Sequence, residues 1–198
     1  MATQLVLIRH GVTEWNKDMR YCGYKDVSLN TQGKAHAMRL RNALKSFEFD
    51  RVYSSDRKRA LQTGRIIFNG AKIIKIGALR EINFGVLEGL THEEIMKKYA
   101  DAYKKWLKDP FKNRIPGAEP MSAFKKRIQA VIKGIIRLNH DKTVAIVCHG
   151  EVIGMFVSGI LKSRNFWRCI PSSASITIVE YKKGAPGIKL FNDTAHLR

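Results

Sequence analysis

Short apolar segments rich in β-forming residues alternate with amphipathic helical segments along this chain, and that alternation limits the folds open to it. Residues 4–8 form a continuous β-prone run, which is typical of a strand buried on both faces of a parallel sheet. Further strands are predicted at 51–54 and 72–76, and helices over 31–47 and from about 55 to 68 lie between the three strands. Strand, helix, strand, helix, strand is the order of an α/β fold.

The second half of the chain continues this pattern after one interruption. One or two helices are expected over 91–109, and three of the five prolines fall in the segment 109–120, which predicts a loop. The remaining predicted elements, in chain order, are a helix at 122–138, a strand at 143–148, a helix at 151–161 and strands at 174–181 and 187–191.

Length and composition agree with a folded domain of this class. The chain has 198 residues, of which 44% are apolar and 27% charged, a globular composition. One domain of this size buries on the order of 70% of its unfolded surface. We therefore predict an α/β fold, a three-layer α/β/α sandwich with a mostly parallel central sheet, helices on both faces and a small helical insertion lobe. Residues 1–198 should form a single domain, with 91–120 as an inserted helical and loop lid.

The chain is strongly basic, with 36 Lys and Arg against 17 Asp and Glu and a formal net charge of +19 at pH 7. The basic residues are spread along the whole chain, and the longest basic runs are the three-residue segments 57–59 and 125–127. No basic tail, zinc-finger spacing or aromatic-interleaved motif accompanies them. A solvated positive surface is therefore favoured over specific binding of nucleic acid.

Cysteine usage and apolar runs bear on the compartment. Cys22, Cys148 and Cys169 are an odd number without close spacing, which suggests neither a disulfide framework nor a four-cysteine zinc site. The longest early apolar run, residues 5–8, is too short for a signal-peptide core or a membrane span. We therefore predict a cytoplasmic protein without a membrane partner.

Polar residues of complementary chemistry follow four of the predicted strands. Arg9 and His10 follow the first, Arg59 comes soon after the second, Glu81 after the third and His149 after the fourth. Because ligands of open α/β sheets bind at the carboxyl ends of the strands, these side chains should converge at one edge. Guanidinium groups suit phosphate oxygens, a neutral imidazole can attack phosphorus, and a carboxylic acid can protonate a leaving alkoxide. Each residue alone has an ordinary structural explanation, so the convergence carries the prediction of phosphoryl chemistry.

Other phosphate and metal chemistries lack their motifs. Ser28 stands where a Walker A loop ending in Gly33 would need glycine. No cysteine is followed six residues later by arginine, and no two aspartates lie two positions apart, which excludes the phosphatases with cysteine and aspartate nucleophiles. Met96 stands where a zinc-protease helix starting at His92 would place its second histidine. The sequence thus favours a mechanism with neither metal nor cofactor.

Five blocks, in order along nearly the whole chain, resemble the histidine phosphatase superfamily, also called the phosphoglycerate mutase-like family. A match to Arg9-His10-Gly11 alone is a weak signal, whereas five ordered blocks are specific. The blocks are residues 7–16, residues 20–26 with 29–30 and 33, residues 53–63, residues 79–85 with 88–89, and residues 147–150.

The resemblance implies roles for the residues in these blocks. His10 would be the nucleophile that becomes transiently phosphorylated, and His149 would be its partner. Arg9 and Arg59 would hold the phosphoryl oxygens, and His149 would donate to the same group as charge builds in the transition state. Further substrate contacts would come from Asn16, Gly23 and Gly150.

The resemblance also implies an acid, Glu81. It would protonate the leaving oxygen and then, as a carboxylate, activate the water that hydrolyses the phosphohistidine, which requires a raised pKa or a well-placed proton supply. Glu88 is the less favoured alternative. Arg57 stands where the family commonly has an apolar residue, so this cation lies either near the pocket mouth or in water.

Phosphatases and mutases of this family share the phosphohistidine and differ in whether water or a second hydroxyl receives the phosphate. About 60 residues separate Gly89 from His149, a short lid that would admit water, so hydrolysis is favoured. The segments 173–181 and 192–197 resemble the smaller bacterial phosphatases, including those acting on α-ribazole phosphate, phosphoserine or a broad range of esters. Trp106 and Phe111 either line the leaving-group pocket or pack a small helical lobe.

The expected partner is a small phosphorylated metabolite, and formation of a homodimer is left open. Two alternatives to a phosphatase stay open as well: a cofactor-dependent phosphoglycerate mutase and a basic nucleic-acid-binding module.

Overall fold

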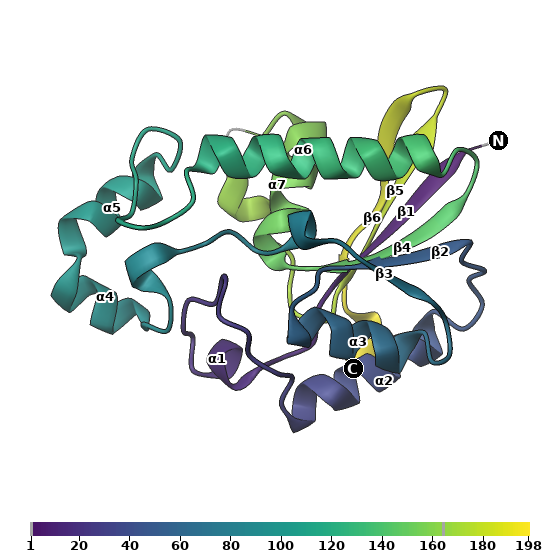
Figure 1. Ribbon diagram of the computed structural model, residues 1–198, viewed down its shortest axis with the longest axis horizontal. Helices are drawn as coiled ribbons and strands as arrows, with labels where there is room; N and C mark the ends of the chain where they lie inside the picture. Colours follow the sequence, from purple (N-terminus) through teal and green to yellow (C-terminus); the bar gives the residue numbers. More distant parts are fainter. Residues whose placement is uncertain (1, 164) are drawn as a thin grey trace.

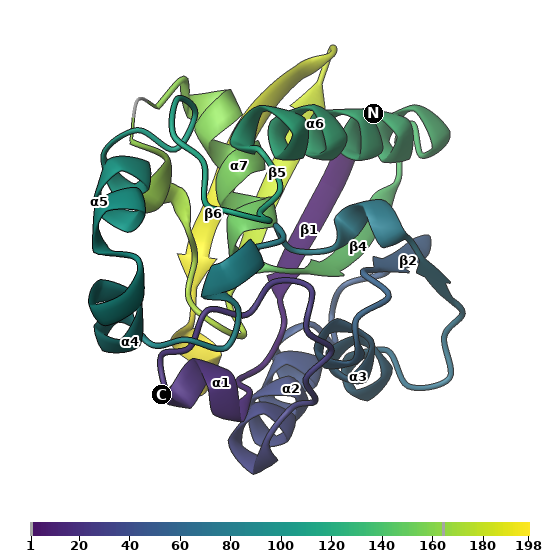
Figure 2. The same cartoon turned by 60° about the vertical axis from the view of Figure 1, so that its left-hand side comes forward.

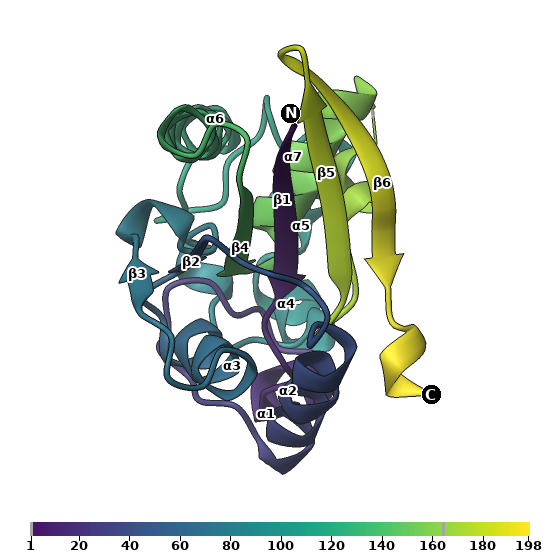
Figure 3. The ribbon, with the colours of Figure 1, turned by 90° about the vertical axis from the view of Figure 1, so that its right-hand side faces the viewer.

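A computed structural model describes residues 2–163 and 165–198 (Figure 1). Within these residues one six-stranded sheet has the order β3-β2-β4-β1-β5-β6, and Figure 3 shows its strands side by side. Strands β1 to β4 pair in parallel, whereas β5 runs antiparallel to both β1 and β6. The strands are β1 Thr3–Arg9, β2 Arg51–Ser54, β3 Ile73–Lys75, β4 Thr143–Cys148, β5 Ile176–Lys182 and β6 Ala185–Asp193.

Helices cover both faces of the sheet, which confirms the predicted three-layer α/β/α architecture. Helices α2 and α3 lie on one face, and α6 and α7 lie on the other. The helices are α1 Glu14–Lys17, α2 Thr31–Ala43, α3 Lys58–Ile67, α4 His92–Lys98, α5 Ala100–Lys108, α6 Met121–Leu138 and α7 Gly150–Leu161. Short 3₁₀ turns lie at 77–79, 85–87, 166–169 and 195–197.

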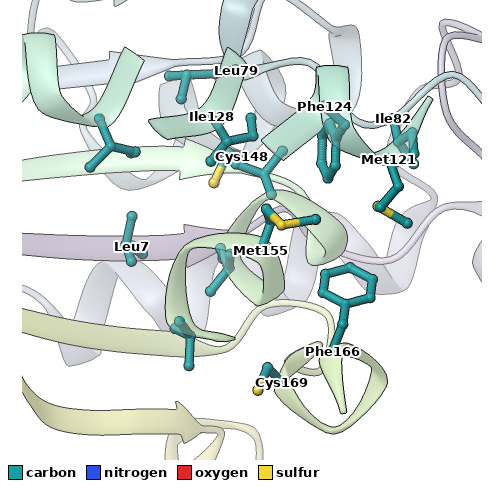
Figure 4. Close-up of a cluster of buried hydrophobic side chains, with 14 of the residues drawn as sticks. Leu7, Leu79, Ile82, Met121, Phe124, Ile128, Cys148, Met155, Phe166 and Cys169 are labelled. Carbon is teal, nitrogen blue, oxygen red and sulfur yellow. The ribbon is translucent and has the colours of Figure 1, made fainter. Parts of the chain in front are cut away.

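The central strand β1 contributes side chains to both hydrophobic cores. Because successive side chains of a strand point to opposite faces, Val6 and Ile8 pack toward α2 and α3 while Leu5 and Leu7 pack in the larger core with α6 and α7. All four are buried, and each contributes about 1.5–3 kcal/mol through burial. Figure 4 shows part of the larger core, where Leu7 and Phe124 belong to the same cluster.

A helical lobe formed by α4, α5 and the loop 109–120 lies beyond one end of α6 (Figure 2). Helix α5 buries Tyr103 and Trp106 in the larger core, and the Trp106 and Trp167 rings meet edge to face with centroids 4.9 Å apart. Phe111 is 48% exposed. Trp106 is therefore a packing residue of the lobe, the second of the two alternatives that the sequence left open.

The clearest departures from the predicted elements are at the end of α2 and at α1. Helix α2 ends at Ala43 rather than at residue 47. Leu44 and Phe47 lie in the turn that follows, where the Phe47 N–H donates to the Leu44 carbonyl. Both side chains still pack in the core with α2, so the apolar pattern continues beyond the end of the helix. The short helix α1 was not predicted, since it buries no residue and so has no apolar periodicity. Its start is instead fixed by a capping box between Thr13 and Asn16.

Across the described ranges, none of the helices has the length and apolar character that crossing a bilayer requires.

We expect Gly33→Ala to lower the free energy of unfolding by about 1–3 kcal/mol, because a close backbone approach leaves no room for a methyl group. A Cβ at Gly33 would lie 2.0 Å from the Val12 carbonyl oxygen. The matched control is Gly134→Ala in α6, where a Cβ meets nothing within 4 Å, and this change should raise stability by about 0.5–1 kcal/mol. Urea denaturation measures both, and equal effects of the two changes would contradict the prediction.

Candidate active site

The site lies where β1 and β4 end side by side. These strands pair in parallel with Arg9 opposite Cys148, so the next residues of the two strands, His10 and His149, emerge together. Their ring centroids are 5.2 Å apart in an edge-to-face arrangement. The convergence predicted from the strand ends is therefore present in the fold.

His10 is held as a neutral imidazole with a defined tautomer. Its Nδ1 lies 2.7 Å from the Gly11 carbonyl oxygen, which can only accept, so Nδ1 carries the proton and Nε2 carries the lone pair. The Arg59 Nε–H donates to that lone pair at 3.2 Å. Burial, Arg59 and Arg9 hold the pKa of His10 well below its usual value. A neutral ring with a lone pair on Nε2 is the nucleophilic form of histidine.

Arg59 in α3 is fully buried and joins His10 to the loop that follows α1. Its guanidinium donates to the carbonyl oxygens of Lys25 at 2.9 Å, Gly23 at 2.8 Å and Cys22 at 3.3 Å. A Cβ at Gly23 would lie 2.1 Å from the Ile82 carbonyl oxygen, so glycine lets this loop approach the segment that carries Glu81. In this structure Gly23 thus positions Arg59 through its carbonyl group.

Arg9 retains an unused donor. One terminal nitrogen of its guanidinium donates to the Pro171 carbonyl, while its buried Nε has no partner among the described residues. A buried donor without a partner costs about 1–3 kcal/mol, a cost that a phosphoryl oxygen would remove. Gly150 makes room for this arginine, since a Cβ there would lie 3.0 Å from Arg9 Cζ.

His149 is fully buried and precedes the first residue of α7. Its Nε2 lies 2.8 Å from the Ser55 hydroxyl, and its Nδ1 has no partner within the residues described. Burial lowers the pKa of His149 well below its usual value, and the charges of Arg59, His10, Arg9 and Arg57 lower it further. Ser55, which orients this ring, was not predicted as a site residue, although it follows the second strand.

Glu81 is buried and lines the same cavity as His10, and its surroundings favour the protonated carboxyl group. Its Oε1 accepts from the Ile82 N–H at 3.0 Å, and its Oε2 accepts from the Glu151 N–H at 3.1 Å. Burial first, and then the nearby Glu151 carboxylate, raise the pKa of Glu81 well above its usual value despite these two hydrogen bonds. A raised pKa favours the protonated form of a carboxyl group, which can donate a proton.

Glu88 and Arg57 both contact Tyr24 in the loop that follows α1. The Glu88 carboxylate accepts from the Tyr24 and Lys25 N–H groups at 2.6 and 2.8 Å, so it shapes the loop and leaves Glu81 as the acid candidate. The half-buried Arg57 lies over the Tyr24 ring, 5.1 Å from its centroid. It is not part of the cavity lining, and its charge is near enough to the site to lower the pKa of His149.

A cavity of about 290 Å³ opens beside these groups. Four of the predicted residues line it, whereas Arg59 and His149 contact His10 without reaching the lining. No residue of 91–120, all of which the structure describes, lines it. The lining residues are Arg9, His10, Asn16, Met19, Arg20, Tyr21, Cys22, Glu81, Phe84, Glu151, Trp167 and Ile170.

The aromatic side of this cavity and Glu151 were missed by sequence reasoning. Tyr21, Phe84 and Trp167 come from three loops or turns without apolar periodicity. Glu151 follows His149 by two positions, where the sequence pattern indicates only the start of a helix. Asn16 was predicted as a substrate contact, and here its side-chain oxygen accepts from the Thr13 N–H and hydroxyl.

A larger hollow of about 540 Å³ lies at the other end of the sheet, between α6, α7 and the β5–β6 hairpin. Its lining is mainly apolar and contains none of the predicted site residues. In the described part of the chain, no three His, Cys, Asp or Glu side chains gather closely enough to hold a metal ion.

Comparison with known proteins matches this geometry to one family. A sequence model of the histidine phosphatase superfamily (branch 1) matches residues 5–194. The chain is 28% identical to "Phosphoserine phosphatase 1" of Hydrogenobacter thermophilus over 98% of this chain and 94% of that protein. It is 31% identical to "Probable phosphoglycerate mutase GpmB" of Escherichia coli O1:K1 / APEC, over 80% and 74% of the two chains. A phosphoserine phosphatase from Entamoeba histolytica, solved with 3-phosphoglyceric acid, superposes with a TM-score of 0.88 at 31% identity, covering 99% and 100% of the chains.

Proposed function

The chain belongs to the histidine phosphatase superfamily (branch 1), and on that basis we propose that it hydrolyses small phosphomonoesters through a phosphohistidine formed on His10. The observation that carries this proposal is the state of His10, a buried neutral imidazole whose Nε2 lone pair meets the Arg59 guanidinium. Glu81, a carboxyl group that holds its proton, lines the same cavity. The proposed nucleophile and the proposed acid thus line one cavity, and Arg59 contacts the nucleophile from behind the lining.

The proposed reaction has two steps. In the first, His10 Nε2 attacks phosphorus, the bond to the ester oxygen breaks, and Glu81 gives its proton to that oxygen so that a neutral alcohol leaves. In the second, ionised Glu81 takes a proton from water as the water oxygen attacks the phosphohistidine, which releases inorganic phosphate and restores His10. Arg9 and Arg59 would stabilise the charge of the transferring group in both steps.

Activity on p-nitrophenyl phosphate tests this proposal. EDTA-treated protein should release p-nitrophenol at mildly acidic to neutral pH, and rapid quenching should trap phosphate on the protein in an acid-labile, base-stable form, as a phosphohistidine is. Activity that EDTA removes and only a metal ion restores would contradict the proposal.

A mutase is the second candidate, supported by the similarity to the GpmB protein. A mutase should be stimulated by 2,3-bisphosphoglycerate and should transfer phosphate to a monophosphoglycerate with little release. We propose a small phosphorylated metabolite as the substrate. Ranking α-ribazole 5′-phosphate, phosphoserine, phosphoglycerates and sugar phosphates by kcat/KM would identify it.

We expect Glu81→Gln to lower kcat/KM on glycerol 1-phosphate by about 10²–10⁴-fold, because its alkoxide must be protonated as it leaves. On p-nitrophenyl phosphate, whose phenolate leaves without a proton, the loss should be about tenfold or less. Steady-state kinetics on both esters measure this difference, and the exposed Glu93→Gln in α4 is the control. Equal losses of kcat/KM on the two esters would show that Glu81 does not protonate the leaving group.

A further inference from the structure

Glu151 places a second carboxyl group beside the proposed acid. It lies in the first turn of α7, half-buried, and lines the active-site cavity. Its N–H donates to Glu81 Oε2 at 3.1 Å, and its carboxylate lies close enough to raise the pKa of Glu81. The mechanism described above assigns no role to this residue.

Two carboxyl groups in contact cannot both be ionised without strong repulsion, so such a pair retains one proton between them. A hydrogen bond between carboxyl groups requires that proton, because two carboxylates have only acceptors. The closeness of Glu151 to Glu81 therefore favours the protonated form of Glu81.

Among the described residues, the groups around the pair are neutral thiols and histidines, and cations that form no ion pair with either carboxylate. Burial raises the pKa of Cys148 and raises that of Cys22 to about 11, so both thiols are neutral. Arg127 donates to the Glu81 carbonyl, but its charge is paired with Glu119 at 2.6 Å. The titratable and charged groups that face the pair or adjoin it are Arg9, His10, Arg20, Tyr21, Cys22, Arg59, Glu88, Arg127, Cys148 and His149.

The cations of that group have other partners. Arg20 pairs with Glu94 at 2.9 Å, and Arg59 donates to His10 and to the loop carbonyls. Arg9 donates to the Pro171 carbonyl. Both histidines have pKa values well below the usual one and are neutral. Within the described residues, no ion pair to either carboxylate of the pair competes with the shared proton.

We propose that Glu151 is a positioning residue that shares one proton with Glu81 and thereby keeps the acid loaded between turnovers. This proposal rests on the proposed phosphatase function. When Glu81 protonates the leaving oxygen, the pair is left with two negative charges, and the proton removed from the attacking water restores the shared proton. The pair thus returns to its starting charge in each cycle without a further reactant.

The test is the pH dependence of kcat/KM for Glu151→Gln, on glycerol 1-phosphate and on p-nitrophenyl phosphate. The charge of Glu151 repels that of ionised Glu81 and so favours the protonated form. Removing the charge lowers the pKa of Glu81, so Glu81 loses its proton at a lower pH. The alkaline limb of the kcat/KM profile on glycerol 1-phosphate should move to lower pH by about one unit. At pH values above the limb, kcat/KM should therefore fall approximately tenfold. On p-nitrophenyl phosphate the limb should stay in place.

Two further variants complete the design. Glu151→Asp keeps a carboxyl group and should restore the limb toward its original position, while Glu93→Gln should leave both profiles unchanged. An unmoved limb in Glu151→Gln, a uniform loss at every pH, or an equal shift on both esters would overturn the role of Glu151. If the unaltered protein hydrolyses neither ester, the proposed phosphatase function itself fails, which is a separate result.

A direct measurement covers the case in which Glu151→Gln does not fold. In the unaltered protein with isotope-labelled glutamate side chains, NMR should show a carboxyl signal that Glu81→Gln removes and that titrates well above the ordinary glutamate value of about 4.3. A second carboxyl signal should respond in the same pH interval, as expected for coupled sites. Independent titration of the two groups near the ordinary value would overturn the proposal.

Discussion

Replacing His10 with alanine should lower kcat on p-nitrophenyl phosphate by about 10⁴-fold while leaving the protein folded. The loss is large because His10 would form the covalent bond to phosphorus, and no other histidine lines the cavity in the described part of the chain. His149, the nearest imidazole, is fully buried and holds the Ser55 hydroxyl. The matched control is His140→Ala, which removes an exposed histidine.

Three measurements check this expectation together. Steady-state rates give the loss of kcat, acid-labile phosphate on the quenched protein should disappear, and thermal unfolding should remain cooperative. A His10→Ala protein that retains near-normal turnover, or that still accumulates phosphohistidine, would assign the nucleophile elsewhere.

Arg59→Ala should have the largest combined effect on stability and activity. Arg59 is fully buried and its guanidinium serves His10 and three loop carbonyls, so alanine leaves those acceptors unpaired and a void in their midst. We expect the free energy of unfolding to fall by about 3 kcal/mol or more. The same change should lower kcat/KM by about 10²–10³-fold, as expected for the loss of one charge-stabilising donor.

The neighbouring Lys58→Ala is the control for Arg59→Ala, since it removes an exposed cation from the same helix turn. Urea denaturation and steady-state kinetics should show little change there. If Arg59→Ala and Lys58→Ala lost activity equally, the contribution of Arg59 would be its positive charge in general rather than a specific contact.

The amino-acid sequence is sufficient to predict the mostly parallel sheet and the convergence of Arg9, His10, Arg59, Glu81 and His149 at one edge of it. The uninterrupted apolar run of β1 indicates a strand buried on both faces, and the gathering of ligands at strand carboxyl ends predicts that Arg9, His10 and His149 converge, as they do. The predicted helices and strands have the correct type because the apolar periodicity of each segment marks the face that the fold buries.

Features that depend on three-dimensional contacts between loops could not be predicted from the sequence. Tyr21 and Trp167 are far apart in the chain, lie in segments without periodicity and meet only at the cavity. The contact of Glu151 with Glu81 likewise arises because α7 starts where the segment after β3 passes, a relation that no local pattern reveals. The antiparallel direction of β5 also depends on a long connection rather than on its own residues.

The hydrogen bond from Arg59 to the lone pair of His10 has a consequence for selectivity. In the proposed mechanism His10 Nε2 is the attacking atom, and between turnovers its lone pair accepts the Arg59 hydrogen bond, so an electrophile without negative charge meets a nitrogen whose electrons are in use. An anionic group competes for the guanidinium, loosens that engagement and frees the nitrogen in the same event. Recognition of the phosphate and exposure of the reactive atom are thus one step, and esters that lack the anion should remain unreacted at this pocket.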